Sequence, residues 1–274
     1  MSDIKSRTAD LKHLRSLLFA PGSDERKLRK ALEAGADLAV ADLEDGVAPE
    51  RKGGARELVA RVRPHAVRVN GVDTPWFQDD LALLRGLQLD AVMLPKASPE
   101  SVAALGDEGP PVIAIVETAQ GLRLAFETAS RPRVAALMLG TADLGAELGL
   151  EPREDELEIL YARSKVVVDS AAAGVRPPID VVHLDFRDLA GLERSARFAR
   201  SLGFGAKACI HLDQVPVVNS VFAPDSDEVE WARRVVEAFE RGEREGRGAV
   251  ALEGTMVDLP VVERARRILE RRSA

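Results

Sequence analysis

Short apolar runs recur along the chain, and each run ends abruptly in a polar cluster. Runs of this length bounded by turn residues are typical of buried strands in a parallel sheet. Segments with apolar residues three and four positions apart separate these runs and predict helices. We predict strands at residues 16–21, 38–45, 66–70, 91–96, 112–117, 135–140, 178–185 and 205–211.

The first predicted helix illustrates the helical pattern. Asp24 is a suitable N-cap, and Leu28, Ala31 and Leu32 share one face of a helix over Glu25–Gly35. Further helices are predicted from residue 49, at 75–87, from 99, between 119 and 133, at 154–173 and at 189–202. The repeated strand–helix units predict an α/β fold, a TIM (β/α)8 barrel, with a doubly wound open sheet as the alternative.

The C-terminal part of the chain exceeds what a barrel needs. We assign residues 1–223 to the barrel and residues 224–274 to an extension. The extension contains predicted helices at 227–241 and 261–271, and a passage at 238–258 that is rich in glycine and charge. Because such surplus often forms a lid or an oligomer contact, we predict a C-terminal helical extension and lid. It would pack on the same domain or on a neighbouring subunit.

The composition is that of an ordinary globular protein, with 46% hydrophobic and 30% charged residues. The net charge of −7 argues against a nucleic-acid partner. The single cysteine, Cys209, rules out a disulfide framework and favours a reducing compartment. Neither a signal peptide nor an apolar run of the ~20 residues that span a membrane is visible. We expect a cytoplasmic protein with no membrane partner.

Two carboxylates end neighbouring predicted strands. Glu117 ends the fifth strand, and Asp143 lies one turn beyond the sixth. Because parallel strands of a barrel open onto one face at their C-terminal ends, we expect the two side chains to approach each other. Two converging carboxylates suit a hard divalent cation that water or substrate also binds. The alternative is that each carboxylate only caps the helix after it.

Arg68 lies inside an apolar strand, where an unpaired guanidinium is costly, so it needs an anionic partner. That partner is either Glu44 or Asp45 at the end of the next strand, or a substrate carboxylate, which the planar guanidinium fits well. Glu44 and Asp45 could equally accept hydrogen bonds from metal-bound water.

Arg26 and Lys30 are four residues apart on the first predicted helix and share a face near its N-terminus. This arrangement suits a phosphate, although a solvated charged face is the alternative. His211 ends the eighth predicted strand on the same rim of the barrel. Cys209, in the middle of that strand, is expected in the core.

Eight segments, in order along the chain, carry a family resemblance. They are RSLLFAPG (15–22), DLEDGVAPERK (42–52), VRVNGVDTPWF (67–77), VMLPKA (92–97), ETAQGL (117–122), LGTADLG (139–145), GFGAKACIH (203–211) and GTMVDLPVVERA (254–265). Together they resemble the citrate lyase β-subunit (CitE-like) family, within the wider group of HpcH/HpaI aldolases and acyl-CoA carbon–carbon lyases. The resemblance runs from Arg15 to about Leu269.

The resemblance implies a TIM barrel in a homo-oligomer, a trimer or a hexamer, with Mg2+ as cofactor on Glu117 and Asp143. It implies that Arg68 binds the carboxylate of a 2-oxo acid. Relatives usually have proline after the matched histidine, where this chain has Leu212. The positions that contact coenzyme A in relatives are matched here by Phe19, Arg26, Lys30, Ile210 and His211.

The resemblance also implies further roles at the reacting atoms. Asp258 would be the catalytic acid or base, offered from a neighbouring subunit, although it could equally be only the N-cap of the last helix. Arg15 would help to hold an enolate oxygen. Backbone N–H groups at the start of a helix, from Gly140, Thr141 and Ala142, would bind the substrate carboxylate together with Arg68.

The implied activity is a Mg2+-dependent, Claisen-type cleavage or condensation of a citryl-, malyl- or citramalyl-CoA-like thioester, with oxaloacetate, glyoxylate or another 2-oxo acid as the second product. One alternative is an HpcH/HpaI-like aldolase for 4-hydroxy-2-oxo acids, which needs no coenzyme A. The other is a subunit that acts on an acyl-carrier thioester only in a complex with other lyase subunits.

Overall fold

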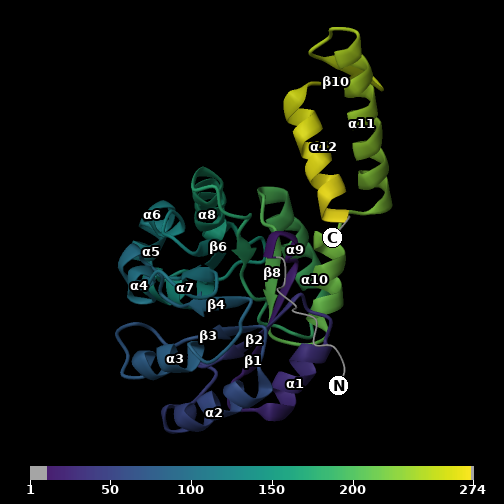
Figure 1. Cartoon of the computed structure of the whole chain (residues 1–274). Coiled ribbons are helices and arrows are strands. Elements are labelled where there is room, and N and C mark those ends of the chain that lie inside the picture. The colour runs from purple at the N-terminus through teal and green to yellow at the C-terminus, as the bar shows by residue number, and fades with distance from the viewer. Residues whose placement is uncertain (1–10, 273–274) are drawn as a thin grey trace, which may run out of the picture. The chain divides into compact units, whose positions relative to one another are not determined.

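The computed structural model describes residues 11–272, which fall into two compact units. The first unit ends at Phe222 and contains a closed barrel, and the second begins at Ala223. Figure 1 shows the elements of both units. No helix within the described residues is long and apolar enough to cross a membrane.

The barrel is built from eight parallel strands that pair in chain order, and the eighth pairs with the first. This closure confirms the predicted (β/α)8 barrel and excludes the open sheet. The strands are β1 (Ser16–Pro21), β2 (Leu38–Asp42), β3 (Ala66–Arg68), β4 (Ala91–Leu94), β5 (Val112–Val116), β6 (Val134–Leu139), β7 (Ile179–Asp180) and β8 (Ala206–Cys209).

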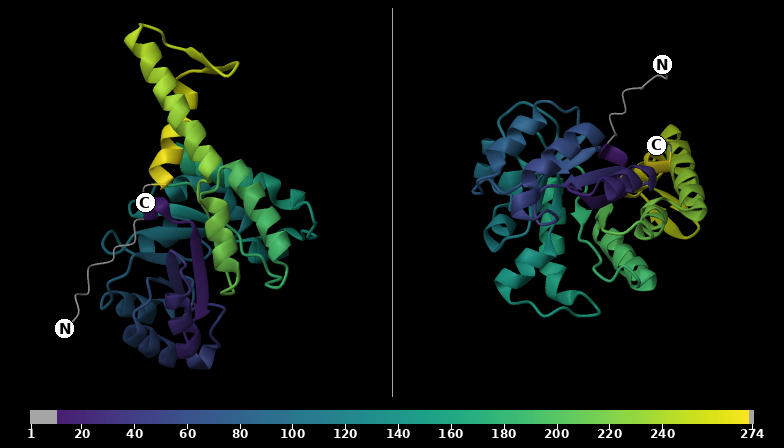
Figure 2. Two further views of the ribbon diagram at one scale, coloured as in Figure 1. Left: turned by 90° about the vertical axis from the view of Figure 1, so that its right-hand side faces the viewer. Right: turned by 90° about the horizontal axis from the view of Figure 1, so that it is seen from below.

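Helices surround the strands (Figure 2). Several begin at a capping side chain, such as Asp24, which accepts a hydrogen bond from the Lys27 N–H, and Ser98, which forms a capping box with Ser101. The helices are α1 (Glu25–Glu33), α2 (Lys52–Val62), α3 (Phe77–Leu84), α4 (Pro99–Ala104), α5 (Ala119–Arg123), α6 (Ala125–Ala129), α7 (Thr141–Leu148), α8 (Leu160–Ala172), α9 (Leu189–Leu202) and α10 (Gln214–Phe222). Short 3-10 turns are η1 (Leu11–His13), η2 (Pro49–Arg51) and η3 (Leu157–Ile159).

Alternate residues along each strand divide the core into two layers. One layer packs the outward side chains, such as Ala39 and Ala41, against the helices. The other is a separate cluster to which every strand contributes, as Leu38 and Val40 do from β2. This second cluster fills the barrel interior, so the next residue in the same alternation points toward the C-terminal mouth of the barrel.

Several predicted boundaries were wrong. The second strand, for example, was predicted to residue 45 but ends at Asp42. The seventh strand was predicted over 178–185 but pairs only at Ile179–Asp180, because the chain then turns outward and Leu184 is 70% exposed. The single helix predicted between 119 and 133 is divided at Leu124, whose ψ of 18° is not helical. The helix predicted from residue 154 begins as α8 only after the left-handed residue Glu156 and the turn η3.

A buried ion cluster joins β7 and β8 to the helices outside them. Asp180 accepts hydrogen bonds from Arg163 of α8 at 2.9 and 3.1 Å and from the ammonium of Lys207 at 2.5 Å. The side chains of all three residues are fully buried. Ser195 of α9 also accepts a hydrogen bond from Lys207. Cys209, at the end of β8, is buried in the outer layer as expected.

The second unit is an antiparallel pair of helices with a small hairpin. Helix α11 (Ser226–Arg244) begins at Asp225, which forms a capping box with Glu228. Helix α12 spans Leu259–Arg272. The glycine-rich passage between them contains strands β9 (Val250–Leu252) and β10 (Thr255–Val257), which the sequence pattern did not predict. The unit has its own core of Ala232, Val235, Phe239, Val257, Val262 and Ala265.

Candidate active site

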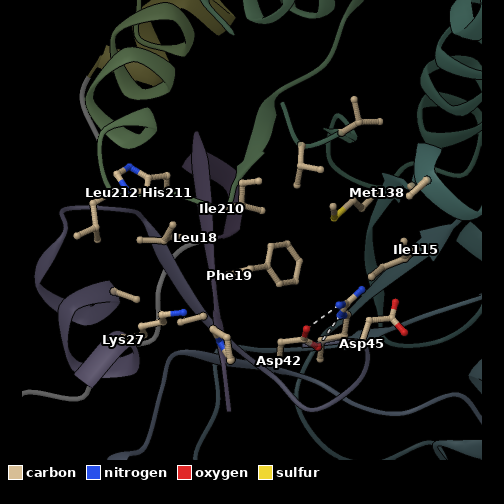
Figure 3. A pocket seen from close by; sticks show the side chains of 18 of the residues that line it. Leu18, Phe19, Lys27, Asp42, Asp45, Ile115, Met138, Ile210, His211 and Leu212 are labelled. Carbon is tan, nitrogen blue, oxygen red and sulfur yellow. Dashed lines mark hydrogen bonds and ion pairs between the residues drawn. The ribbon is translucent and has the colours of Figure 1, made fainter. Parts of the chain in front are cut away.

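A cavity of about 630 Å3 lies at the C-terminal ends of the barrel strands (Figure 3). Apolar side chains from the barrel interior form one wall, among them Phe19 of β1, Ile115 of β5 and Met138 of β6. The remaining lining is rich in charge. The charged residues that line the cavity are Arg26, Lys27, Lys30, Asp42, Asp45, Arg68 and Glu117.

Arg68 is held by two carboxylates from the end of β2. Its Nε and Nη2 atoms donate to Asp42 at 2.7 Å each, and its Nη1 lies 2.9 Å from Glu44 Oε2. Burial opposes the guanidinium charge, but the hydrogen bonds to Asp42 and the attraction of Asp42 and Glu44 raise the pKa of Arg68 above its ordinary value. The predicted ion pair with Glu44 is therefore present, whereas Asp45 is exposed at the cavity edge.

The main partner of Arg68, Asp42, was missed by the sequence prediction. Every second side chain of β2 points into the barrel, and Asp42 follows Leu38 and Val40 in this series. This period-two pattern is the sequence signal that could have identified Asp42 as a residue of the barrel mouth. A guanidinium has five N–H donors, and the three contacts to Asp42 and Glu44 leave two for a ligand. The Phe19 ring lies 5.3 Å from the guanidinium carbon.

Glu117 and Asp143 both contact Lys96, which follows β4. Glu117 Oε1 accepts a hydrogen bond from the Lys96 backbone N–H at 2.9 Å, and Asp143 Oδ2 lies 2.8 Å from the Lys96 ammonium. Thr118, not Glu117, caps α5, because its hydroxyl accepts from the Gly121 N–H. The cap alternative therefore does not account for Glu117.

Glu117 is a buried carboxylate whose negative charge a bound cation would stabilise. Its side chain is 7% exposed, and burial, with Glu44 nearby, raises its pKa to about 7. Within residues 11–272 no cluster of three or more metal-ligating side chains exists. The pair Glu117 and Asp143 still fits Mg2+, because this ion is commonly held by one or two carboxylates and keeps water or substrate oxygens as its other ligands.

The start of α7 forms part of the same mouth. Gly140, Thr141 and Ala142 line the cavity. The prediction that the Gly140 N–H binds a substrate carboxylate was wrong, because this N–H donates to the Val116 carbonyl at 3.0 Å. For Thr141 and Ala142 the role stays a prediction. A Cβ atom at residue 140 would lie 2.6 Å from Glu117 Oε2, so only glycine lets the backbone pass this close to the carboxylate. The first N–H groups of a helix have no partner within the helix, so they are suited to bind an anion here.

A basic helix and an apolar rim complete the cavity. Arg26 and Lys30 of α1 line it as predicted, together with Lys27, which was not predicted. Ile210 and His211 line it as well. The His211 ring stacks on Phe186 with ring centroids 5.0 Å apart, and Leu212 follows at the edge.

The predicted role of Arg15 in holding an enolate oxygen was wrong. It precedes β1, so it lies at the N-terminal end of the barrel, opposite the mouth that the other end of β1 lines. Its side chain donates to both carboxylate oxygens of Asp37, at 2.7 and 3.0 Å. Arg15 is therefore an ion-pair partner at the base of the barrel and cannot hold an enolate in the cavity.

Asp258 belongs to the second unit. Its backbone carbonyl accepts a hydrogen bond from the Val262 N–H at 3.1 Å, at the start of α12. The side chain is partly exposed. This position agrees with its predicted place just before the last helix, and its catalytic role stays a prediction.

A lysine and an asparagine beneath the site fix the ends of β2 and β3. Lys52 is buried and donates to the carbonyls of Leu43 and Glu44, at 2.7 and 2.9 Å, and to the Asn70 side chain at 2.6 Å. Asn70 in turn donates to the buried carboxylate of Asp80. Because these bonds hold the backbone of Glu44, they position the carboxylate that faces Arg68.

Comparisons with known proteins show what the whole chain is similar to. A (3S)-malyl-CoA thioesterase from Cereibacter sphaeroides is 37% identical over 271 residues, which cover 95% of each chain. The mitochondrial citramalyl-CoA lyase of Homo sapiens is 36% identical over 284 residues, covering 92% of this chain and 83% of the relative. The crystal structure of CitE from Mycobacterium tuberculosis in complex with magnesium, acetoacetate and coenzyme A matches with a TM-score of 0.83 and 38% identity, over 95% of this chain and 98% of that chain.

The family comparison covers the whole barrel mouth. The sequence pattern of the HpcH/HpaI aldolase/citrate lyase family matches residues 15–212, which include Arg68, Glu117, Asp143 and the rim at His211. These findings confirm the resemblance seen in the sequence motifs. The chain belongs to the HpcH/HpaI aldolase/citrate lyase family.

Proposed function

We propose that this chain is a Mg2+-dependent carbon–carbon lyase that cleaves a 2-hydroxyacyl-CoA thioester to an acyl-CoA and a 2-oxo acid. The observation that carries the proposal is that Lys96 contacts both carboxylates, Glu117 through its backbone N–H and Asp143 through its ammonium. Glu117 and Arg68 line the same cavity. A basic helix lines the same cavity, so one site offers both an oxo-acid cradle and cations for a phosphorylated ligand.

The oxo-acid end of the site is assigned to three groups. Glu117 and Asp143 would hold Mg2+, which supplies a Lewis acid for a keto or hydroxyl oxygen. Arg68 keeps two N–H donors for the carboxylate of the acid. The N–H groups of Thr141 and Ala142, at the start of α7, bind the same carboxylate, whereas the Gly140 N–H is already bonded to the Val116 carbonyl. Asp42 and Glu44 fix the guanidinium, so binding requires little ordering of Arg68.

The coenzyme A end is assigned to the opposite wall. Arg26 and Lys30 present charges to phosphate groups, and Phe19, Ile210 and His211 offer apolar contacts to the rest of the ligand. This basic wall favours a thioester over the CoA-free aldolase reaction, because a 4-hydroxy-2-oxo acid has no phosphate for it to bind.

The proton transfer is assigned to Asp258, acting from a neighbouring subunit of a homotrimer or hexamer. A carboxylate at this position removes a proton from the thioester α-carbon during condensation and returns it during cleavage. The segment Asp258–Leu259–Pro260 precedes α12, and proline restricts the backbone next to the carboxylate. This assembly and this role rest on the family resemblance.

Hydrolysis of the thioester is the second candidate function. The observation that favours it is the 37% identity to a (3S)-malyl-CoA thioesterase over 95% of both chains. The two reactions differ in products. The lyase forms an acyl-CoA and a 2-oxo acid, whereas hydrolysis releases free coenzyme A and a hydroxy acid.

One experiment separates these functions. The protein is incubated with malyl-, citramalyl- or citryl-CoA and Mg2+, and acetyl-CoA, 2-oxo acid and free thiol are measured together. We expect acetyl-CoA and a 2-oxo acid in equal amounts, lost on chelation of the metal and in Glu117→Gln. Free thiol without oxo acid would instead establish the thioesterase. Cleavage of 4-hydroxy-2-oxo acids but of no CoA thioester would establish the aldolase, and turnover of carrier-bound citryl groups alone would establish the carrier-dependent subunit.

A further inference from the structure

Lys96 occupies an unusual position between β4 and α4. Its φ of 48° places it in the left-handed region, which lysine seldom adopts. Such strain persists only where surrounding contacts enforce it, and it often marks a functional site. Here the contacts are three carboxylates, because Lys96 touches Glu117 through its backbone N–H and Asp143 and Glu44 through its ammonium.

The two halves of Lys96 act on different atoms. The backbone N–H holds Glu117 Oε1 at 2.9 Å, and this bond does not depend on the side chain. The ammonium lies 2.8 Å from Asp143 Oδ2 and 3.2 Å from Glu44 Oε1, so it bridges a carboxylate of the metal site and the carboxylate that faces Arg68. The side chain is 44% exposed, so the ammonium can leave Asp143 without a backbone movement.

The ammonium and a divalent cation need the same carboxylate. A metal ligand must offer its oxygen lone pairs to the ion, and Asp143 Oδ2 now offers them to Lys96. We propose that Lys96 is a built-in counter-ion that competes with Mg2+ for Asp143 and thereby weakens and tunes the metal affinity of the site. This inference rests on the metal site of the proposed function. When the ion binds, Lys96 retains Glu44 as its partner.

The charge balance gives the direction of the effect. The group contains four carboxylates, from Asp42, Glu44, Glu117 and Asp143. Arg68 and the Lys96 ammonium contact the first two and Asp143, and Glu117 is bonded to the Lys96 backbone N–H. Removal of the Lys96 charge leaves this group more negative and removes the competitor, so a divalent cation should bind more tightly. A lysine that only supported the fold would show the opposite effect, because its loss would loosen the carboxylates.

The test measures metal binding directly, without turnover. Mn2+ is titrated into metal-free protein and followed by its electron paramagnetic resonance signal, and Mg2+ is measured by competition. Lys96→Met removes the charge at similar length, and Lys96→Asn removes it with a residue that tolerates the left-handed backbone. Lys96→Arg restores the charge. Lys27→Met is the matched control, because Lys27 lines the same cavity and no contact joins it to Glu117 or Asp143 in the described residues.

We expect Mn2+ to bind on the order of tenfold more tightly to Lys96→Met and Lys96→Asn, as for the loss of one nearby charge at a partly exposed site. Lys96→Arg should return toward the wild-type affinity, and Lys27→Met should stay within about twofold of it. Thermal unfolding confirms that each variant is folded. Unchanged or weaker binding in the two neutral variants overturns the inference. If Glu117→Gln binds Mn2+ as the wild type does, the proposed metal site itself is wrong, and the role of Lys96 fails with it.

Discussion

Gly140 shows how little space the site leaves at the scale of single atoms. A Cβ atom there would lie 2.6 Å from Glu117 Oε2 and 2.7 Å from Glu117 Cβ. No carbon atom is tolerated at these distances, so an added methyl group must move the Glu117 side chain or the start of α7. Either movement separates Glu117 from the helix that bears Asp143.

Gly140→Ala should therefore weaken Mn2+ binding by tenfold or more, about 1.4 kcal/mol, which is within the usual cost of overpacking a tight site. Gly145→Ala is the control on the same helix, because a Cβ there meets no atom within 4 Å. It should bind Mn2+ normally and raise the unfolding temperature slightly, since alanine favours helix over glycine. Equal Mn2+ affinities in the two variants would show that the close approach of Gly140 to Glu117 has no effect on the site.

Residue positions were predictable where one charge interrupts or ends an apolar strand, as for Arg68 and Glu117. Asp42 was missed because three acidic residues follow one another closely here, Asp42, Glu44 and Asp45. Only the alternation with Leu38 and Val40 shows that Asp42 points into the barrel. The ammonium of Lys96 could not be placed from sequence, because its two partners, Glu44 and Asp143, lie far from it along the chain. Arg15 was misplaced because its motif spans all of β1, a strand about 17–20 Å long, whose two ends serve opposite faces.

At the scale of elements, β7 is the weakest part of the barrel ladder. It pairs with β6 at one position and with β8 at two. The cluster of Asp180, Lys207 and Arg163 compensates with side-chain contacts, since it ties β7 to β8 and to α8. Although burial disfavours the charge of Asp180, the attraction of Lys207 and Arg163 lowers its pKa below the ordinary value.

Asp180→Asn leaves the buried ammonium of Lys207 without a counter-charge and leaves Arg163 with Glu156 alone. It should destabilise the protein by about 3–5 kcal/mol, measured by urea unfolding. The pKa of Asp180 is lower in the folded state than in the unfolded chain. Its stabilising effect is therefore complete above the unfolded pKa, near 4, and is lost as the pH falls from there through the lower folded pKa. The difference between wild type and variant should therefore shrink in acid. Asp155→Asn, at an exposed pair with Arg153, is the control and should barely move the midpoint. A similarly small change in stability in both variants would contradict a stabilising role of the buried ion cluster.

Element order was predictable because the apolar period changes between strand and helix along the chain. The exact residues at which strands and helices begin and end were less predictable. The alternation continues through Val181 and Val182 although no strand pairs with them, and pairing depends on neighbours that the local sequence does not contain. The β9–β10 hairpin was missed because its strands have only three residues each, too few for a period to be visible.

At the scale of the whole molecule, the proposed acid–base residue and the proposed metal site belong to different units of the chain. Glu117 belongs to the barrel unit and Asp258 to the second unit. If Asp258 acts across a subunit interface, as we propose, then no single subunit holds a complete site. The eight-unit repeat was enough to predict the barrel, whereas the role of the second unit depends on assembly, which periodicity does not report.

Mixing of two inactive variants tests this arrangement. Asp258→Ala and Glu117→Gln should each lack lyase activity. When they are mixed equally under conditions of subunit exchange, a site is intact only if its barrel comes from the first variant and its Asp258 from the second. In a cyclic homo-oligomer this leaves about a quarter of sites active, since each choice has a probability of one half. No recovery, despite exchange shown by co-purification of differently tagged subunits, would contradict action in trans.

The burial of Cys209 has a practical consequence for labelling experiments on this protein. It is the only cysteine in the chain, and burial raises the pKa of its thiol to about 12. Maleimides react with the thiolate, so this residue should stay unmodified near neutral pH. Two cysteines introduced at exposed positions, one in each unit, would then be the only reactive thiols. Spin labels or fluorophores attached at such pairs can measure the distances between barrel and second unit in solution, without first replacing Cys209.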